Sequence, residues 1–212
     1  MNDIKGTYSD TEFSYFEPRI CVIGPGWVGL DLARSFSAKY ETILFNIDQA
    51  PVKPIVDRHD STPAVPDELL QAKLQTDLTC TSDIEKIRLC NFYVVTVPAP
   101  EELNNHPDLQ PLWKVCEILG KVISGGNIVV CETTLCSGVT EEACISLIEE
   151  MSGLTCHIDF FAGCSPGWSN ATDKLHSAEK TGEETFRSTP EIGKIVHEIY
   201  SAIVVTREDI SA

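Results

Sequence analysis

The chain has 212 residues, of which 42% are hydrophobic, and its formal net charge is −16. The length suits one domain with a sizeable core, and the negative charge disfavours nucleic acid and anionic membranes as partners. No apolar run reaches about 18 residues, and the first residues lack the basic and apolar parts of a signal peptide. We therefore expect a cytoplasmic protein that binds a small molecule and neither nucleic acid nor membrane.

The chain contains nine cysteines, and none of them forms a C-x-x-C pair. No Cys/His spacing resembles a zinc site, so we predict no metal. Free cysteine behaves as a small buried hydrophobe, and we expect reduced thiols on strands or apolar helix faces. Four of them fit this expectation by their positions: Cys21, Cys116, Cys131 and Cys144.

The first elements are predicted as follows. Residues 1–17 form a polar N-terminal arm, and residues 18–212 form one domain. The apolar run 19–23 predicts a buried strand, which enters a glycine turn and then an apolar helix. A second strand is predicted over 42–47.

Prolines interrupt the next part of the chain, where a second helix would otherwise be expected. A short helix is predicted to resume over 67–75, and the β-branched run 92–97 predicts another strand. The elements beyond it alternate: a helix over 112–123, a strand over 127–131, a helix over 139–151, a strand over 159–163, a helix opened by Thr189-Pro190 and a short strand over 203–205. This alternation predicts an α/β fold of Rossmann type, a doubly wound, mostly parallel sheet with helices on both faces.

The glycine turn carries the clearest functional signal. Gly24, Gly26 and Gly29 are spaced as G-x-G-x-x-G between a predicted strand and a predicted helix. The first glycine allows the tight turn, the second lets the backbone approach a pyrophosphate, and the third lets the helix pack on the strand. Peptide N–H groups at the helix start, including those of Trp27 and Val28, would face the anion.

The second predicted strand should carry the acid that holds the cofactor ribose. Asn46 occupies the expected position, and Asp48 lies two residues further on, on the same side of the strand. Either side chain could contact a ribose, although an amide lacks the charge that makes such a contact strong.

Seven segments, in this order, give the chain its resemblance to a known family. They are Ile23-Gly-Pro-Gly-Trp-Val-Gly-Leu30, His59-Asp-Ser-Thr62, Val95-Thr-Val-Pro-Ala-Pro100, Pro107-Asp-Leu109, Glu132-Thr-Thr-Leu-Cys-Ser-Gly138, Thr140-Glu-Glu142 and Ser165-Pro166. With them the chain resembles the UDP-glucose/GDP-mannose dehydrogenase family, and within it the UDP-N-acetyl-hexosamine dehydrogenases. The resemblance covers residues from about Arg19 to Val205.

The resemblance implies an NAD-dependent enzyme that oxidises a sugar alcohol twice to an acid. It implies that Thr134 is the active-site threonine and that Thr96 and Pro98 line the nicotinamide side. Apart from the resemblance, the position of Glu132 at a strand end allows two interpretations: a base, or a solvated or hydrogen-bonded carboxylate. The family's central helix and second domain, which carry the catalytic Lys, Asn, Cys and Asp, have no counterpart in residues 1–212, so we expect them to be absent.

Three parts of the chain depart from the family pattern. The family's Ser-Pro-Glu-Arg becomes Ser165-Pro166-Gly167-Trp168, the acid of the second strand is Asn46, and the cation that follows it aligns with Pro51. These changes remove charge and add apolar bulk. We therefore expect Trp168 and Cys164 to line a more apolar pocket.

Three functional hypotheses remain open, and they leave undecided whether the chain is an enzyme. The first is a repurposed fold that binds an apolar metabolite, requires no cofactor and catalyses a non-redox step such as cyclisation or isomerisation. The second is an NAD-binding half of a UDP-sugar dehydrogenase that needs a partner chain. The third is a non-catalytic interaction protein, with a homodimer or partner interface on the surface left by the missing central helix.

Overall fold

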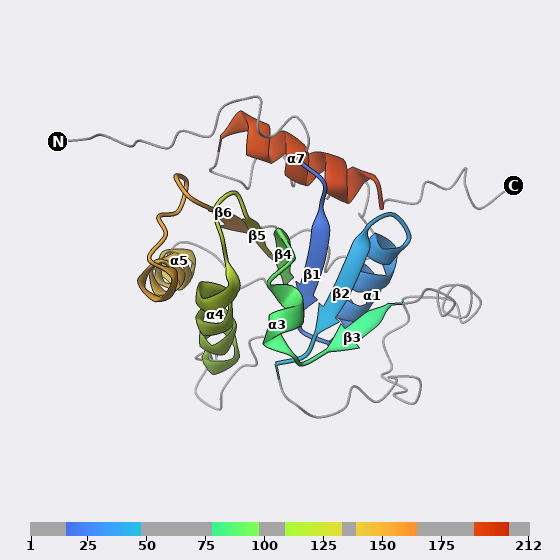
Figure 1. The fold of residues 1–212 in the computed structure, drawn as a ribbon, viewed down its shortest axis with the longest axis horizontal. Coiled ribbons are helices and arrows are strands. Elements are labelled where there is room, and N and C mark those ends of the chain that lie inside the picture. Colours follow the sequence, from blue (N-terminus) through green and yellow to red (C-terminus); the bar gives the residue numbers. More distant parts are fainter. Residues whose placement is uncertain (1–15, 48–77, 98–108, 133–138, 165–188, 204–212) are drawn as a thin grey trace, which may run out of the picture.

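The fold is that of a computed structural model, which describes residues 16–47, 78–97, 109–132, 139–164 and 189–203, without the side chains of residues 27, 139 and 140. Six strands form one sheet in the order β3-β2-β1-β4-β5-β6, and each neighbouring pair is parallel (Figure 1). The strands are β1 Arg19–Ile23, β2 Glu41–Phe45, β3 Thr79–Thr81, β4 Phe92–Val95, β5 Ile128–Cys131 and β6 Phe161–Cys164. This strand order, with β1 and β4 adjacent at the centre, is that of a Rossmann fold.

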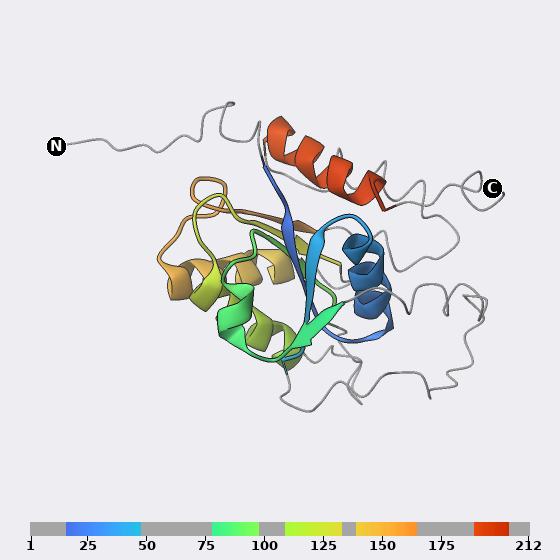
Figure 2. The same ribbon diagram turned by 45° about the vertical axis from the view of Figure 1, so that its right-hand side comes forward.

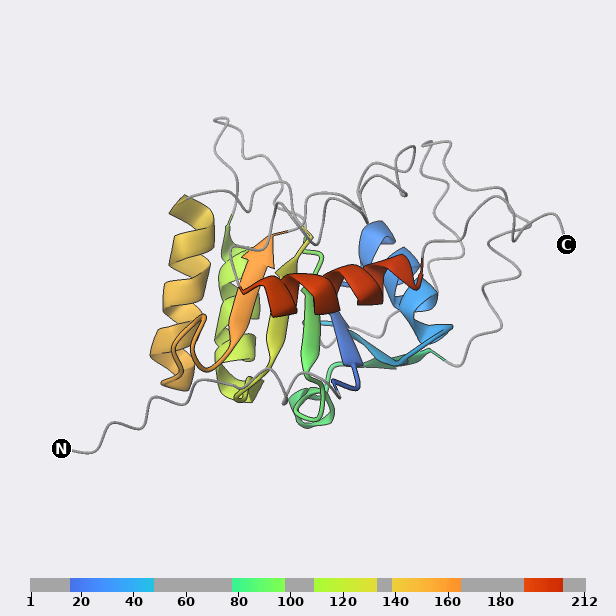
Figure 3. The ribbon, with the colours of Figure 1, turned by 90° about the horizontal axis from the view of Figure 1, so that it is seen from above.

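Helices cover both faces of this sheet. They are α1 Trp27–Ser37, α3 Ile84–Ile87, α4 Gln110–Val122, α5 Val139–Ser152 and α7 Pro190–Ser201. Figure 2 shows α1 and α7 on one side of the strands and α3, α4 and α5 on the other. Viewed from above, α7 lies across the sheet (Figure 3).

Each face has its own apolar layer because both sides of a parallel sheet are buried. The layer under α1 and α7 includes Phe36, Phe92 and Tyr200, all fully or almost fully buried. The rings of Phe36 and Tyr200 meet edge to face, with centroids 5.4 Å apart. The opposite layer joins α4 and α5 to the sheet and contains the buried thiols Cys116 and Cys144.

The predicted fold class is confirmed, and so are the glycine turn and the helices α1, α4, α5 and α7 within a few residues at their ends. The strand predicted over 159–163 begins at Phe161 instead. Asp159 closes a tight loop before it, because its carboxylate accepts a hydrogen bond of 2.8 Å from the N–H of Thr155. The helix predicted over 67–75 lies outside the described residues.

Two further predictions are wrong or incomplete. Ile203 belongs to a turn that closes α7, where its N–H donates to the carbonyl of Tyr200 at 3.2 Å, and not to a strand; residues 204–205 lie outside the described residues. The strand β3 and the short helix α3 were not predicted, because three strand residues and four helical residues are too few to show a period. Asp83 could have indicated the start of α3, because aspartate is a preferred N-cap residue. Its carboxylate caps the helix by accepting a hydrogen bond of 3.0 Å from the N–H of Glu85.

No helix in the described part of the chain is long and apolar enough to cross a membrane.

Candidate functional site

The residues that follow the strands form one row along the carboxyl edge of the sheet. The register pairs Ile23 with Phe45 and with Val95, and Val95 with Cys131. Gly24, Asn46, Thr96 and Glu132 therefore end four adjacent strands at the same level; these four come from the predicted site, and the sheet brings them together. Cys164, at the end of β6, pairs with Cys131 one level below.

The glycine turn leaves β1 with Gly24 in a left-handed conformation, at φ 114°. The N–H of Gly24 donates to the carbonyl of Phe45 at 3.1 Å, which fastens the turn to β2. An added Cβ at Gly24 would lie 3.0 Å from the Thr96 hydroxyl. The backbone conformation therefore favours glycine here, and a Cβ would in addition press on Thr96.

The other two glycines differ in what surrounds them. A Cβ on Gly29 would collide with the carbonyl oxygen of Gly24 and with the hydroxyl of Thr96, whereas a Cβ on Gly26 would meet no atom within 4 Å. Gly29 is thus required by close packing of α1 on the turn. Gly26 is open, as the second glycine of a pyrophosphate cradle should be.

The first turn of α1 begins directly after Gly26, whose carbonyl accepts the N–H of Leu30 at 2.9 Å. The N-cap residue, Gly26, has no side chain that could cap this end of the helix, and the first turn contains no acidic residue. The N–H groups of the first turn carry the positive end of the helix dipole. In a chain with a net charge of −16, this local dipole suits an anion that the overall charge would repel.

Asn46 follows β2 and is 8% exposed. Its N–H donates to the carbonyl of Thr81 at 2.9 Å, so the residue is anchored to the edge strand β3. The bond from Gly24 to Phe45 places the start of the glycine turn beside it. Asn46 therefore lies at the end of β2 and next to the turn, where the predicted ribose contact requires it.

Glu132 follows β5 and is 8% exposed, with its N–H donating to the carbonyl of Val95 at 2.8 Å. Burial, together with the neighbouring Glu132 carboxylate, raises the pKa of Tyr200 well above its usual value. No local pattern indicates that α7 brings a tyrosine to this carboxylate, because Tyr200 lies at ordinary helical spacing on an apolar face. Glu132 stays a predicted base.

Cys164 is buried at 5% exposure and is disulfide-bonded. The prediction of reduced thiols is therefore wrong at this position, because spacing along the chain does not reveal which cysteines the fold brings within bonding distance. The predicted place of Cys164 in a pocket stays a prediction. The other seven described cysteines are free.

Several predicted site residues cannot be placed. Asp48, Pro98, Thr134 and Trp168 lie outside the described residues, and the side chain of Trp27 is not described. Their roles stay predictions. Val28 is half-buried in the first turn of α1 and packs against the apolar layer below it. Within the described ranges, no cluster of three or more His, Cys, Asp or Glu side chains could hold a metal ion.

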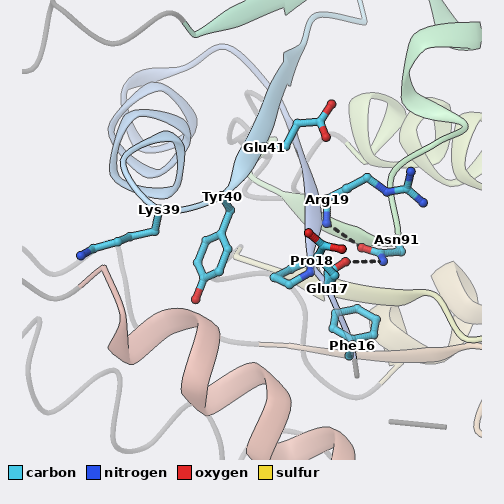
Figure 4. Close-up of a pocket in the computed structure, with 8 residues that line it drawn as sticks. All are labelled: Phe16, Glu17, Pro18, Arg19, Lys39, Tyr40, Glu41 and Asn91. Atoms are coloured by element: carbon cyan, nitrogen blue, oxygen red, sulfur yellow. Dashed lines mark hydrogen bonds between the residues drawn. The ribbon is translucent and has the colours of Figure 1, made fainter. Parts of the chain in front are cut away.

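A hollow of about 630 Å³ lies at the opposite, amino edge of the sheet. Figure 4 shows Lys39 and Tyr40 on one side of it and the start of β1 on the other. Asn91 ties this edge together: its Oδ1 accepts from the N–H of Arg19 at 2.8 Å, and its Nδ2 donates to the carbonyl of Glu17 at 2.9 Å. The hollow has no glycine cradle, and we do not assign the cofactor to it.

Comparisons with known proteins agree with this geometry. A 39% identical relative is the protein CapL of Staphylococcus aureus, and a 38% identical relative is a UDP-N-acetyl-D-glucosamine 6-dehydrogenase of Pseudomonas aeruginosa. These alignments cover 87% and 88% of this chain but 43% and 44% of the relatives, so the chain spans less than half of their length.

Solved structures give the same result for the fold. A GDP-mannose dehydrogenase of Pseudomonas aeruginosa is 25% identical with a TM-score of 0.66, covering 86% of this chain and 44% of that one. A UDP-D-ManNAc dehydrogenase of Pyrococcus horikoshii has the same TM-score at 22% identity, covering 89% and 46%. Residues 18–204 match the NAD binding domain of the UDP-glucose/GDP-mannose dehydrogenase family, and the chain therefore belongs to that family.

Proposed function

We propose that this chain binds NAD over Gly24–Gly29 and serves as the cofactor-binding half of a nucleotide-sugar dehydrogenase. The observation that carries the proposal is the contrast between two glycines of the turn. Gly29 is closed by packing, whereas Gly26 is open among the described residues and, as a glycine, places no side chain at the N-cap of the helix. A structural turn has no need for the open position, whereas a pyrophosphate must approach the backbone there.

Two parts of the described residues would hold the cofactor, and a third would act in the chemistry beside it. Backbone N–H groups of the first turn of α1 would hold the pyrophosphate. Asn46 would hold a ribose hydroxyl, with an amide in place of the usual carboxylate. Bound NAD would supply the acceptor for a hydride from the sugar, and Glu132 at the end of β5 would act as the base that the sequence predicts.

The substrate class follows from the relatives. The relative from Pseudomonas aeruginosa, whose alignment covers 88% of this chain, is a UDP-N-acetyl-D-glucosamine 6-dehydrogenase. We infer a UDP-N-acetyl-hexosamine as the substrate of the whole enzyme, with the sugar-binding part supplied by sequence beyond the aligned region. None of the comparisons favours a cyclase or an isomerase, so the cofactor-binding half replaces the repurposed fold as our interpretation. The predicted interface, on the surface that the family's central helix covers, stays a prediction.

Calorimetric titration of NAD⁺ and NADH into the chain tests this proposal. The wild type should bind, and Gly26→Ala should keep the wild-type Tm while binding NAD⁺ about tenfold more weakly, since the added methyl occupies only the space that the pyrophosphate needs.

Gly153→Ala is the matched control, because a Cβ there also meets no atom within 4 Å, at the end of α5 and far from the turn. Its φ of 73° makes alanine strained by about 1 kcal/mol, so this variant should lose stability and keep its affinity for NAD⁺. A wild-type chain that releases no heat with either form of the cofactor at millimolar concentration would overturn the proposal.

A further inference from the structure

The side chain of Thr96 lies directly beneath the glycine turn. Thr96 follows β4 and is 6% exposed. Its N–H donates to the carbonyl of Ile23 at 2.9 Å, as the next rung of the parallel ladder. Its hydroxyl lies 3.1 Å from the carbonyl oxygen of Ile23 and 3.0 Å from that of Gly24, so one proton is shared between two carbonyls of the turn.

The same hydroxyl also fills the space between two of the glycines. A Cβ on Gly24 would lie 3.0 Å from Thr96 Oγ1, and a Cβ on Gly29 would collide with that atom. The hydroxyl thus lies in the corner formed by Gly24, the residue after β1, and Gly29, the third residue of α1. Its position sets how closely the start of the helix approaches the strand.

The direction of the first-turn N–H groups depends on this arrangement. These groups stabilise an anion only where they point at it, and a turn held in the binding conformation avoids the cost of ordering it when the ligand arrives. The bond from Gly24 to Phe45 holds one side of the turn. Thr96, the residue after β4, contacts the other side of the turn through its hydroxyl, which lies next to the carbonyl of Gly24.

We propose that Thr96 is a positioning residue for the dinucleotide: its hydroxyl holds the turn at Gly24 and Gly29 in the conformation that binds the pyrophosphate. This inference rests on the proposed function. It differs from the role that the family resemblance suggests for Thr96, a contact on the nicotinamide side, because the hydroxyl here is directed at backbone carbonyls of the turn.

The test compares Thr96→Val with Thr96→Ser by calorimetric titration of NAD⁺ and by thermal unfolding. Valine keeps the shape but replaces the hydroxyl with a methyl, which cannot donate and which presses on the carbonyl group of Gly24. We expect Thr96→Val to bind NAD⁺ about tenfold more weakly and Thr96→Ser to stay within about twofold of the wild type.

Asn91→Ala is the matched control at the other end of β4. Asn91 also fastens β1 through hydrogen bonds to backbone atoms, at Arg19 and Glu17, but at the amino edge. This variant should lower the Tm and leave the affinity for NAD⁺ unchanged. If Thr96→Val lowers the Tm in the same way without weakening NAD⁺ binding, Thr96 is only structural and the inference is wrong.

Two other outcomes are also decisive. Equal weakening in Thr96→Ser and Thr96→Val would show that the methyl rather than the hydroxyl holds the turn, and would overturn the inference. If Thr96→Val does not fold, Thr96→Ala removes the hydroxyl without placing a methyl against Gly24, and the same affinity criterion applies to it. A wild-type chain without NAD binding would refute the proposed function itself, which is a separate result.

Discussion

The carboxyl and amino edges of this sheet are built from the same strands, yet they differ in what they permit. At the carboxyl edge, the turn after β1 is packed so closely that a methyl group on Gly29 would collide with its neighbours and one on Gly24 would press on Thr96, while Gly26 has space. At the amino edge, polar side chains around Asn91 line an open hollow. The difference is between a tightly packed turn, where we propose that the cofactor binds, and an open edge where the hydrogen bonds of Asn91 tie the start of β1 to the start of β4.

Gly29→Ala should have the largest effect. The new Cβ would collide with the carbonyl oxygen of Gly24 and with the Thr96 hydroxyl, and relief requires α1 to move away from β1. We expect the free energy of unfolding to fall by about 3 kcal/mol, and NAD⁺ binding to be lost. Urea unfolding followed by circular dichroism, with calorimetric titration, measures both. If the variant unfolds at the same urea concentration as the wild type, the turn at the carboxyl edge is not closely packed around Gly29.

Gly120→Ala adds a methyl of the same size where α4 packs on α5. Its Cβ would collide with the Cβ of Met151, close to the amino edge. The free energy of unfolding should fall by about 1–3 kcal/mol, and the affinity for NAD⁺ should not change because the helix start at Gly26 is remote. The same two measurements apply. Weaker NAD⁺ binding in this variant would mean that packing near the amino edge affects the cofactor site at the carboxyl edge, and the two edges would then not be independent.

Asn46→Asp should have the smallest effect, and it would sharpen the assignment of the carboxyl edge. A carboxylate at the end of β2 should hold the cofactor ribose more strongly and repel a 2′-phosphate. We expect the affinity for NAD⁺ to rise about threefold, roughly 0.6 kcal/mol, and the preference for NAD⁺ over NADP⁺ to widen. Titrations with both cofactors measure this change, with Asn46→Ala as the control that removes the amide. Weaker NAD⁺ binding by Asn46→Asp would place the ribose elsewhere.

Much of this molecule could be predicted from local patterns in the sequence. Continuous apolar runs gave β1 and β4, helical spacing gave α4 and α7, and the three glycines between a strand and a helix gave the turn. These features depend on neighbours in the chain, and their physical causes are visible in a short window.

The contacts that give the site its geometry could not be predicted in this way. Thr96 and Gly24 are 72 residues apart, and no local pattern indicates that a hydroxyl after β4 would reach a carbonyl after β1. Tyr200 lies next to Glu132 although it belongs to α7, the last helix of the described residues. Such pairs arise from the order of strands in the sheet, which was predicted only as a class.

Helix α7 also sets the shortest piece of this polypeptide that can be expected to fold by itself. Its residues Ile192, Val196 and Tyr200 are almost wholly inaccessible to water and cover the strands beside Phe36. An expression fragment that ended at Cys164 would leave that half of the interior wet and prone to self-association, even though every strand would be present. Boundaries for recombinant pieces should therefore fall beyond Ile203.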